Sequence, residues 1–206
     1  MNKKWRRLTH AEWTKMIASG GYDTVGVLKF DNGRYIAPKL AHALYKAYWH
    51  KVDRTMFGTA ADKGYGVTRW CFTELGSDGC NLHMHFAAVA PFDPMPFCAV
   101  LNALWADFHV RTAGCSHNWI TPIQDSTRAA GYTSKSTKLS SDDTTGLAAS
   151  FQPDLDLDHD TFDPEAQAQR ISNRLTAHQL EQAYSELHRH ISETERRLKL
   201  RQIKAR

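Results

Sequence analysis

One stretch of sequence decides the fold: LHMHFAAVA, residues 82–90. Its apolar character predicts a buried strand, which Pro91 ends. Alternate side chains of a strand share a face, so His83 and His85 point one way while Met84 points into the core. Histidines that only fill a core ordinarily come singly. Two imidazoles on an otherwise small or apolar strand face therefore indicate a candidate site.

A carboxylate is expected beside these histidines because a hairpin precedes the strand. The sequence VTRWCFTEL, residues 67–75, predicts the partner strand, and GSDG, residues 76–79, predicts a tight turn. Centring the hairpin on this turn pairs Glu74 with Asn81, which places the carboxylate on the histidine face and diagonal to His83. Two imidazoles and one carboxylate with open positions suit a catalytic divalent metal, for which we expect Mn²⁺ or Mg²⁺. A structural zinc site would instead favour thiolates and a closed shell.

The rest of the chain predicts how this hairpin is embedded. Strand and helix patterns alternate in the order β-α-β-β-α-β, followed by another helix. This order is the split β-α-β, ferredoxin-like arrangement, an α+β fold with an antiparallel central sheet, helices on one face and the other face free for a site. A capping-box pattern at Thr9 and Glu12 predicts a short helix before it, up to about Ser19. The other expected elements are strands at 24–30, 67–75, 82–90 and 117–123, helices at 38–57 and 94–110, and a helix that begins at 125 or 126.

The last predicted helix of this fold carries a second candidate motif, GYTSK, residues 131–135. Tyr132 and Lys135 are three residues apart, so they share a helix face. The pair alone is a weak pattern, because a tyrosine on a helix most often belongs to the core. Small residues before Tyr132 favour a close approach to the sheet, and Lys135 and Lys138 add positive charge that suits a phosphate.

Taken in order, Glu74, the H-M-H triplet at 83–85 and the Y-x-x-K motif at 132–135 resemble the motifs of the HUH endonuclease superfamily. Within that superfamily, the sequence is similar above all to rolling-circle replication initiators with a single tyrosine. The resemblance extends over roughly residues 24–138. It implies that the two histidines and Glu74 bind the metal and that Tyr132 is the catalytic nucleophile, with the lysine of its motif as a catalytic partner.

The resemblance also implies a nicking reaction on single-stranded DNA. Tyr132 would attack a backbone phosphate and leave a 5′-phosphotyrosine and a free 3′-hydroxyl. A tyrosine phenol in water ionises only at about pH 10, so metal charge and Lys135 would both favour the phenolate. The metal would also act on the phosphate as a Lewis acid. Because the covalent bond conserves the phosphodiester energy, a later attack by a hydroxyl can reseal the strand.

The charge of the chain favours a polyanionic partner. Its formal net charge is +4 and its sequence pI is about 8.9, which is the sign that nucleic-acid binding requires. We expect single-stranded DNA or an origin hairpin as the substrate. Because no helicase domain follows in this sequence, we expect a host helicase and polymerase as partners. The residues expected to contact DNA are Arg6, Arg7, Arg69, Arg128 and Lys138.

The sequence predicts three segments. Residues 1–140 form the nicking domain, and residues 141–165 form an acidic linker with eight acids and no lysine or arginine. Asp163 followed by Pro164 is a helix-start signal, from which a long, amphipathic and basic C-terminal helix is predicted over residues 166–206. The apolar stripe of this helix leaves two roles open, packing on the domain or pairing with a second copy in a homodimer.

Nothing in the sequence predicts a membrane protein or an exported one. No apolar run approaches the roughly 20 residues that a membrane span needs, and no apolar segment follows the basic N-terminus as it would in a signal peptide. We therefore expect a cytoplasmic protein that does not bind membranes. The four cysteines form no C-x-x-C pair, so we expect reduced thiols rather than a zinc knuckle.

Two other kinds of function stay open at this point. A single-tyrosine transposase or a relaxase would share the same chemistry, and sequence motifs separate these classes poorly. A non-catalytic nucleic-acid-binding domain of ferredoxin-like fold is the other alternative. Such domains display aromatic side chains on the sheet, and Trp70 and Phe72 share the histidine face.

Overall fold

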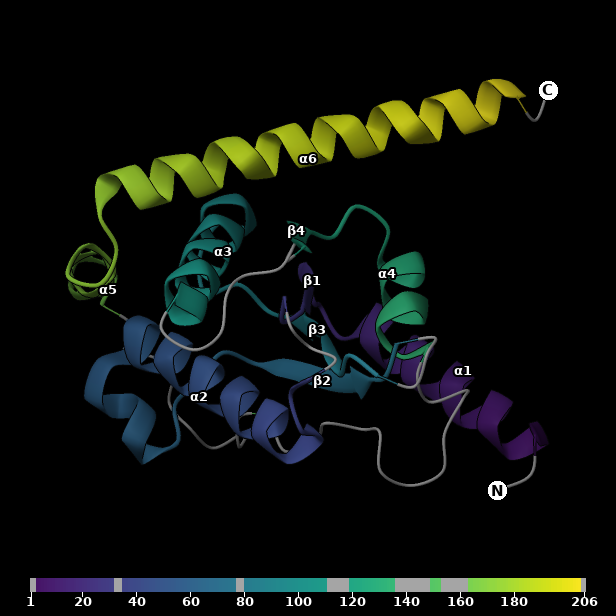
Figure 1. Cartoon of the computed structure of the whole chain (residues 1–206), viewed down its shortest axis with the longest axis horizontal. Helices are drawn as coiled ribbons and strands as arrows, with labels where there is room; N and C mark the ends of the chain where they lie inside the picture. The colour runs from purple at the N-terminus through teal and green to yellow at the C-terminus, as the bar shows by residue number, and fades with distance from the viewer. Residues whose placement is uncertain are drawn as a thin grey trace.

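The computed structural model describes residues 3–31, 35–76, 80–110, 119–135, 149–152 and 163–204 (Figure 1). Within these ranges, the side chains of residues 3–7, 109, 110 and 204 are not described. The strands are β1 (Thr24–Leu28), β2 (Arg69–Glu74), β3 (His83–Ala88) and β4 (Trp119–Pro122). The helices are α1 (Lys3–Ser19), α2 (Pro38–Phe57), the 3₁₀ helix η2 (Gly58–Lys63), α3 (Pro94–Val110), α4 (Ser126–Thr133), α5 (Pro164–Ser172) and α6 (Ala177–Lys204).

The four strands form one sheet in the order β2-β3-β1-β4, and every neighbouring pair is antiparallel. This is the strand order of the split β-α-β arrangement. The predicted α+β fold, with an antiparallel central sheet and a C-terminal helical extension, is therefore confirmed. The two crossover helices, α2 and α3, also have the bounds that the sequence predicts.

One face of the sheet packs on α2 and α3 to form the main core. Met84 and Phe86 of β3 point into this core, where Trp49 of α2 and Trp105 of α3 are buried. Phe86 meets Trp49 edge-on, with ring centroids 4.9 Å apart. Because side chains alternate along a strand, this packing turns the two histidines of β3 to the opposite face, as predicted.

The opposite face of the sheet is not left free. Helices α1 and α4 lie over it (Figure 1), and Ile17, Phe72, Ala87 and Ala130 form a small second core there. Trp13 of α1 packs edge-on against Phe72, with ring centroids 5.1 Å apart. The expectation of helices on one face only is therefore wrong, because Phe72 and Ala87 make this face too apolar to be left to solvent.

Helix α1 begins earlier than the sequence predicts. It starts at Lys3, so Thr9 and Glu12 lie inside the helix and do not form a capping box at its beginning. No glycine or proline occurs in residues 3–8, so no residue there stops the helix from extending toward the N-terminus.

The C-terminal extension consists of two helices rather than the single one predicted. Asp163 caps α5 as expected, because its carboxylate accepts hydrogen bonds from two backbone N–H groups of that helix at 3.0 and 3.1 Å. The helix then breaks because Leu175 turns into the main core, where it is 2% exposed. Thr176 begins the next helix, and its Oγ1 accepts a hydrogen bond from the backbone N–H of Gln179 at 3.2 Å.

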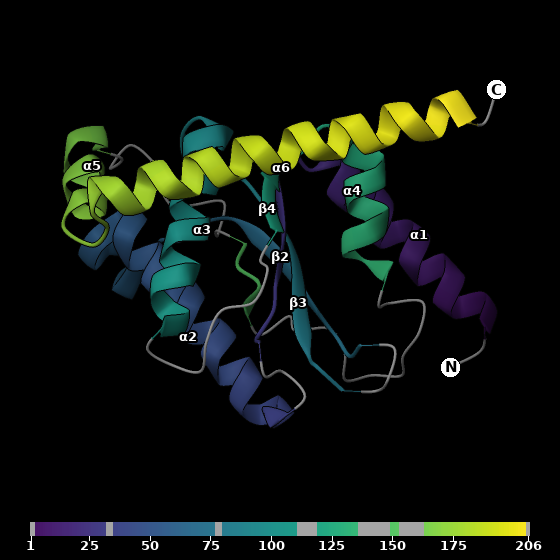
Figure 2. The ribbon, with the colours of Figure 1, turned by 45° about the horizontal axis from the view of Figure 1, so that its top comes forward.

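Helix α6 crosses the molecule from one group of helices to the other. Its first turns pack on α3 through Ala183 and Leu187, which belong to the main core. Figures 1 and 2 show the helix continuing over β4 to the side of the molecule where α4 lies. Packing on the domain is thus one of its roles. None of the helices in the described ranges combines the length and the apolar character that crossing a membrane requires.

Part of the predicted acidic linker belongs to the folded domain. The backbone N–H of Arg69 donates to the carbonyl of Phe151 at 2.8 Å, and that of Phe151 donates to the carbonyl of Arg69 at 3.0 Å. Ser150 Oγ accepts a hydrogen bond from the backbone N–H of Cys71 at 2.9 Å. These residues cover the outer edge of β2, which would otherwise present unpaired backbone groups. The acidic residues of the linker that precede Asp163 lie outside the described residues.

Candidate metal centre and nucleophile

The β2–β3 hairpin brings Glu74 directly opposite His83. These residues are partners in the antiparallel register, as are Phe72 and His85. The predicted pairing of Glu74 with Asn81 is therefore wrong by two residues. Asn81 has a φ of 59°, a left-handed conformation that asparagine tolerates but a regular strand excludes, so the strand pairing ends at His83. A shift of two residues keeps every side chain on its own face, and the carboxylate stays with the histidines.

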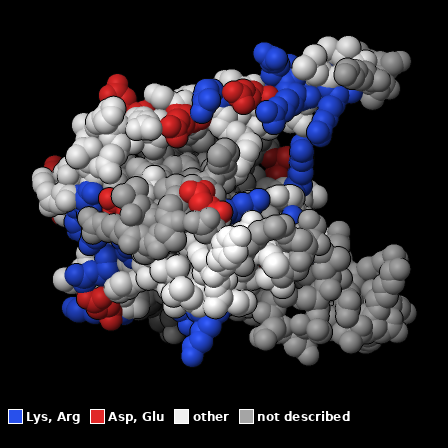
Figure 3. Space-filling view, viewed as in Figure 1, with Lys and Arg blue, Asp and Glu red and all other residues white. Residues whose placement is uncertain are grey.

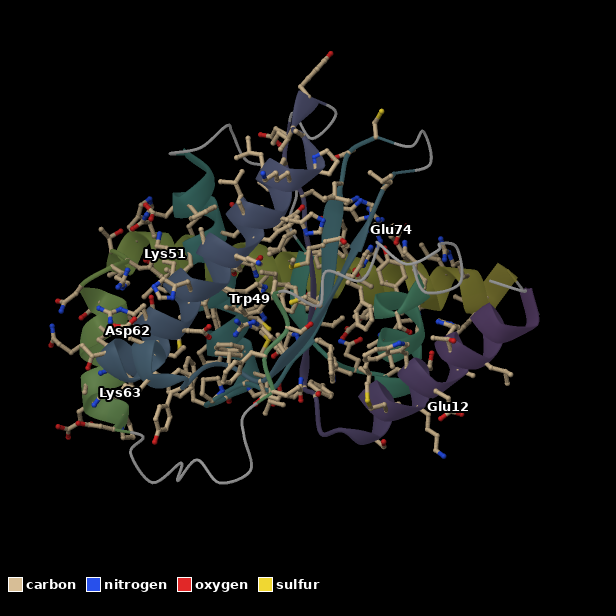
Figure 4. All side chains as sticks on the ribbon, turned by 90° about the horizontal axis from the view of Figure 1, so that it is seen from below. Glu12, Trp49, Lys51, Asp62, Lys63 and Glu74 are labelled. Atoms are coloured by element: carbon tan, nitrogen blue, oxygen red, sulfur yellow. The ribbon has the colours of Figure 1, made fainter. Side chains whose placement is uncertain are left out.

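Glu74, His83 and His85 form a compact group of possible metal ligands, called here the ligand cluster. One ligand atom from each residue lies within 4.8 Å of the other two, and Glu74 Oε2 is 3.3 Å from His85 Nε2. His83 and His85 are 7% and 1% exposed, and Glu74 is half-buried. Figure 4 shows Glu74 on the side of the sheet opposite Trp49 of the main core. The structure thus brings together the three residues that the sequence nominates as metal ligands.

Hydrogen bonds of good geometry occupy few of the ligand atoms of the cluster. His83 Nδ1 lies 3.0 Å from the carbonyl oxygen of Asn81. Because a carbonyl can only accept, Nδ1 donates its proton there and Nε2 of the neutral ring keeps a lone pair. Both ring nitrogens of His85 and Oε2 of Glu74 are buried and form no hydrogen bond of good geometry with the described residues. The ion-pair contacts of Oε2, with His85 Nε2 and with Lys135 Nζ, are both 3.3 Å long.

Such atoms are costly in a folded protein, and a cation would relieve the cost. A buried polar atom without a partner destabilises by about 1–3 kcal/mol. Two imidazoles and a carboxylate are a donor set that divalent metals accept. The residues present therefore fit a divalent cation.

The electrostatics of the cluster favour the protonation states that bind metal. Burial lowers the pKa of His83 and the pKa of His85 below the ordinary value. Burial opposes the ionisation of Glu74, but the neighbouring His85 imidazole and Lys135 ammonium outweigh it, so the pKa of Glu74 is lowered. Neutral imidazoles and an ionised carboxylate are the forms that coordinate a metal, so near neutral pH the cluster is ready to bind one.

Tyr132 lies against the ligand cluster. Helix α4 begins at Asp125, whose side chain accepts a hydrogen bond from the backbone N–H of Arg128 at 3.0 Å. The fully buried Ala130 lets this helix pack closely on the sheet. The Tyr132 ring meets the His85 ring edge-on, with centroids 5.0 Å apart, and the tyrosine is 50% exposed. A phenol in this position touches the cluster and is still open to a substrate.

Lys135 lies over both the phenol and the carboxylate. Its Nζ is 4.4 Å from the centroid of the Tyr132 ring and 3.3 Å from Glu74 Oε2. Helix α4 ends at Thr133, so Lys135 is not on the helix as predicted. The turn that follows the helix nevertheless keeps Lys135 beside Tyr132. The ammonium of the lysine therefore lies next to both the phenol and the carboxylate of Glu74.

Helix α1 contributes to the site through residues that the sequence does not single out. His10 Nδ1 lies 3.1 Å from the carbonyl oxygen of Ser134 and 3.2 Å from its hydroxyl, and Thr14 Oγ1 lies 3.3 Å from the same hydroxyl. Ser134 directly precedes Lys135, so these contacts fix the segment that carries the Y-x-x-K motif. No spacing reveals them, because 124 residues separate His10 from Ser134. The only signal is that His10 and Thr14 share a helix face.

The residues expected to contact DNA have different fates. Arg69 is 6% exposed, and its guanidinium forms a bidentate ion pair with Asp53 at 2.8 and 3.0 Å. The expectation that Arg69 contacts DNA is therefore wrong, because the residue points into the main core and stabilises it. Arg128 is exposed on α4, in the turn before Tyr132. Outside the described residues or side chains lie Arg6, Arg7 and Lys138.

Comparison with known proteins adds no relative. No protein-family model matches the chain, and neither a curated protein nor a solved structure matches it. The likeness to HUH endonucleases therefore depends on the motifs alone. The function has to be inferred from the chemistry of the ligand cluster and of the phenol beside it.

Proposed function

We propose that this protein is a metal-dependent endonuclease that nicks single-stranded DNA and remains joined to the cut end through Tyr132. The observation that carries the proposal is the 5.0 Å contact between the rings of Tyr132 and His85. It places a half-exposed nucleophile beside a buried donor set that suits a catalytic cation. The resemblance of the motifs to those of HUH endonucleases supports the same reaction.

Each residue of the site has a role in this reaction. Glu74, His83 and His85 would hold the divalent cation, Mn²⁺ or Mg²⁺, which when bound supplies a Lewis acid for the scissile phosphate. The phenol oxygen of Tyr132 attacks phosphorus and forms the new ester bond. The bond from phosphorus to the 3′ oxygen breaks, and the proton that the phenol loses is matched by the proton that the 3′-hydroxyl gains. Lys135 moves from Glu74 to the phosphate and favours the ionised phenol.

The product of the reaction suits an initiator of replication. The 5′-phosphotyrosine conserves the energy of the phosphodiester, so the freed 3′-hydroxyl, or one presented by a second protomer, can reverse the attack and reseal the strand. Until then the free 3′ end can prime synthesis by a host polymerase, with a host helicase opening the duplex. We propose rolling-circle replication of a phage, plasmid or integrated element as the process served.

A single-tyrosine transposase or a relaxase would use the same site, so the chemistry does not separate these roles. Transposition requires an obligate dimer, which sedimentation measures directly. The non-catalytic alternative is less well supported. It needs aromatic rings displayed on the sheet, whereas Phe72 is fully buried and Trp70 lies against Trp13 of α1, with ring centroids 4.9 Å apart.

The experiment that tests the proposal is capture of a covalent adduct. The protein is incubated with a pool of labelled single-stranded oligonucleotides and Mn²⁺ or Mg²⁺, and the products are separated under denaturing conditions. We expect a labelled protein band that disappears with a chelator and in Tyr132→Phe, and a DNA-modified peptide that contains Tyr132.

Tyr184→Phe is the matched control for this experiment. Tyr184 is 40% exposed on α6 and packs on His188, with ring centroids 4.6 Å apart, so it too is an exposed tyrosine beside a histidine. This variant should form as much adduct as the wild-type protein. An undiminished adduct in Tyr132→Phe would show that the nucleophile is another residue.

A further inference from the structure

A groove opens beside Tyr132, on the face of the sheet that carries the ligand cluster. Its volume is about 650 Å³, within the range of about 300–1,000 Å³ that is typical of ligand pockets. The floor is formed by β1 and β4, and the walls are formed by α4 and α6. Figures 1 and 2 show α6 crossing over β4 toward α4. The C-terminal helix therefore builds part of a cavity next to the proposed nucleophile.

Two exposed aromatic rings line this groove. Tyr132 is 50% exposed, and Trp119, the first residue of β4, is 41% exposed. The ring of His190 from α6 meets the Trp119 ring edge-on, with centroids 3.7 Å apart, which holds the indole in place. An exposed indole in a groove, supported from one side, is the kind of platform on which a nucleobase stacks.

The charged groups on the walls suit a phosphate backbone. Lys29, directly after β1, and Arg128 of α4 both line the groove. The one acid among the lining residues, Asp125, already accepts the backbone N–H of Arg128 as the cap of α4. Figure 3 shows lysines and arginines gathered over the C-terminal part of α6, the helix that forms one wall of the groove.

We infer that this groove binds the single-stranded DNA segment adjoining the scissile phosphate, with one nucleobase stacked on Trp119. The identity of the strand rests on the proposed function. The groove combines cations, which bind the phosphate backbone, with an aromatic ring on which a base can stack. Proteins that bind single-stranded nucleic acid use the two features together. The groove begins at Tyr132, so a strand lying in it leads directly to the attacking oxygen. Its outer wall, α6, lies outside the part of the chain that resembles HUH endonucleases and is a feature of this protein.

The test measures binding without chemistry. The full chain carrying Tyr132→Phe is titrated, with EDTA present, against a fluorescently labelled oligothymidylate, and anisotropy reports the affinity. In this background, Trp119→Ala should bind about 5- to 150-fold more weakly, the loss expected for one stacked base. Tyr184→Ala removes an equally exposed ring from a histidine contact on α6, outside the groove, and should bind like the parent.

A strand that lacks bases separates stacking from folding. The parent should bind an abasic oligonucleotide of the same length more weakly than oligothymidylate, and Trp119→Ala should no longer distinguish the two. The comparison of the two oligonucleotides with the parent protein needs no substitution at Trp119, so its result stands even if Trp119→Ala folds poorly. Circular dichroism reports whether that variant is folded.

The possible results test the groove assignment and the nicking reaction independently of each other. Equal affinity of the parent and Trp119→Ala, or equal losses in Trp119→Ala and Tyr184→Ala, would overturn the groove assignment and leave the groove to another occupant, such as a second copy of the chain. A wild-type protein that forms no adduct, but loses affinity with Trp119→Ala, would keep the groove as a single-strand site and reject the nicking reaction.

Discussion

Nζ of Lys135 lies 3.3 Å from Oε2 of Glu74, the carboxylate oxygen that a metal ion would need. An ammonium and a divalent cation repel each other at this range, so Lys135 competes with the metal until a phosphate draws it away. We expect Lys135→Gln to bind Mn²⁺ about 2- to 5-fold more tightly, the scale of a partly exposed ion pair, and to form the DNA adduct more slowly. Calorimetric titration and the rate of adduct formation measure the two effects.

The matched control for this prediction is Lys46→Gln. Lys46 is an exposed lysine of α2, on the far side of the sheet. Its substitution by glutamine removes the same charge as Lys135→Gln. It should change neither metal affinity nor rate. If Lys135→Gln formed the adduct faster than the wild type, the role of Lys135 toward the phosphate would have to be abandoned.

His85 should lower the free energy of unfolding of the metal-free protein. It is 1% exposed and its ring nitrogens form no hydrogen bond of good geometry with the described residues. We expect His85→Leu to raise the free energy of unfolding of the metal-free protein by at most about 1–2 kcal/mol, because losing the imidazole that favours the ionised Glu74 offsets part of the gain. The substitution should also abolish the stabilisation by Mn²⁺, as followed by calorimetry with and without the ion. His83→Leu provides the contrast. It leaves the carbonyl of Asn81 without its donor, so it should lose metal binding with no gain in stability.

The stability of the metal-free protein should fall on the acid side of neutral. Burial lowers the pKa of His83 and of His85, so the folded protein binds fewer protons there than the unfolded chain, whose histidines titrate at about pH 6.5. Their contribution is fully present above that pH and is lost as the pH falls toward the lowered pKa values. The slope is at most about 1.4 kcal/mol per pH unit for each histidine. Urea unfolding across this range should show a shallower slope in His85→Leu, and an unchanged slope would contradict the assignment.

His10 should position the nucleophile without touching the metal. Its contacts with Ser134 hold the segment between Tyr132 and Lys135, and a displacement of about 1 Å at a reacting group can cost about 100-fold in rate. We expect His10→Leu to slow adduct formation by up to this factor while Mn²⁺ affinity stays the same. Thr14→Val, which removes one hydroxyl contact with Ser134 at 3.3 Å, should have a smaller effect. A parallel loss of metal affinity would indicate a general loss of structure instead.

Arg69 and Arg128 should separate stability from DNA binding. Arg69→Ala leaves the buried carboxylate of Asp53 without its ion-pair partner, and breaking a buried pair in this way costs about 3–5 kcal/mol. Arg128→Ala should leave the melting temperature unchanged. Instead it should reduce the salt dependence of oligonucleotide binding by roughly 0.7 in the log–log slope, the value for one phosphate contact on a single strand. Equal salt slopes for Arg128→Ala and the wild type would remove Arg128 from the DNA-binding surface.

Much of the candidate site could be predicted because the side-chain period of a strand is two. That period puts His83 and His85 on one face, and it survives the error in register because a shift of two residues preserves every face. The same alternation puts Arg69 on the face of β2 opposite to that of Trp70, so the burial of Arg69 could be predicted. The identity of its ion-pair partner, Asp53, could not. The register itself depends on the φ of Asn81, which the residue type permits but does not require.

Tertiary contacts decided the features that the sequence left uncertain. The break between α5 and α6 follows from the burial of Leu175 in a core built largely by residues far earlier in the chain. The cover over the second face follows from Trp13 meeting Phe72, and local propensity carries no information about such meetings. His10 is recognisable only once α1 and α4 are seen side by side.

Helix α6 buries Leu187 in the main core, and a few turns later Leu198 lines the groove beside Tyr132. Substitutions in α6 that change the stability of the fold and substitutions that change the shape of the groove would therefore fall on the same helix. A fragment without α6 would expose the apolar core surface that Leu187 covers and would lose one wall of the groove.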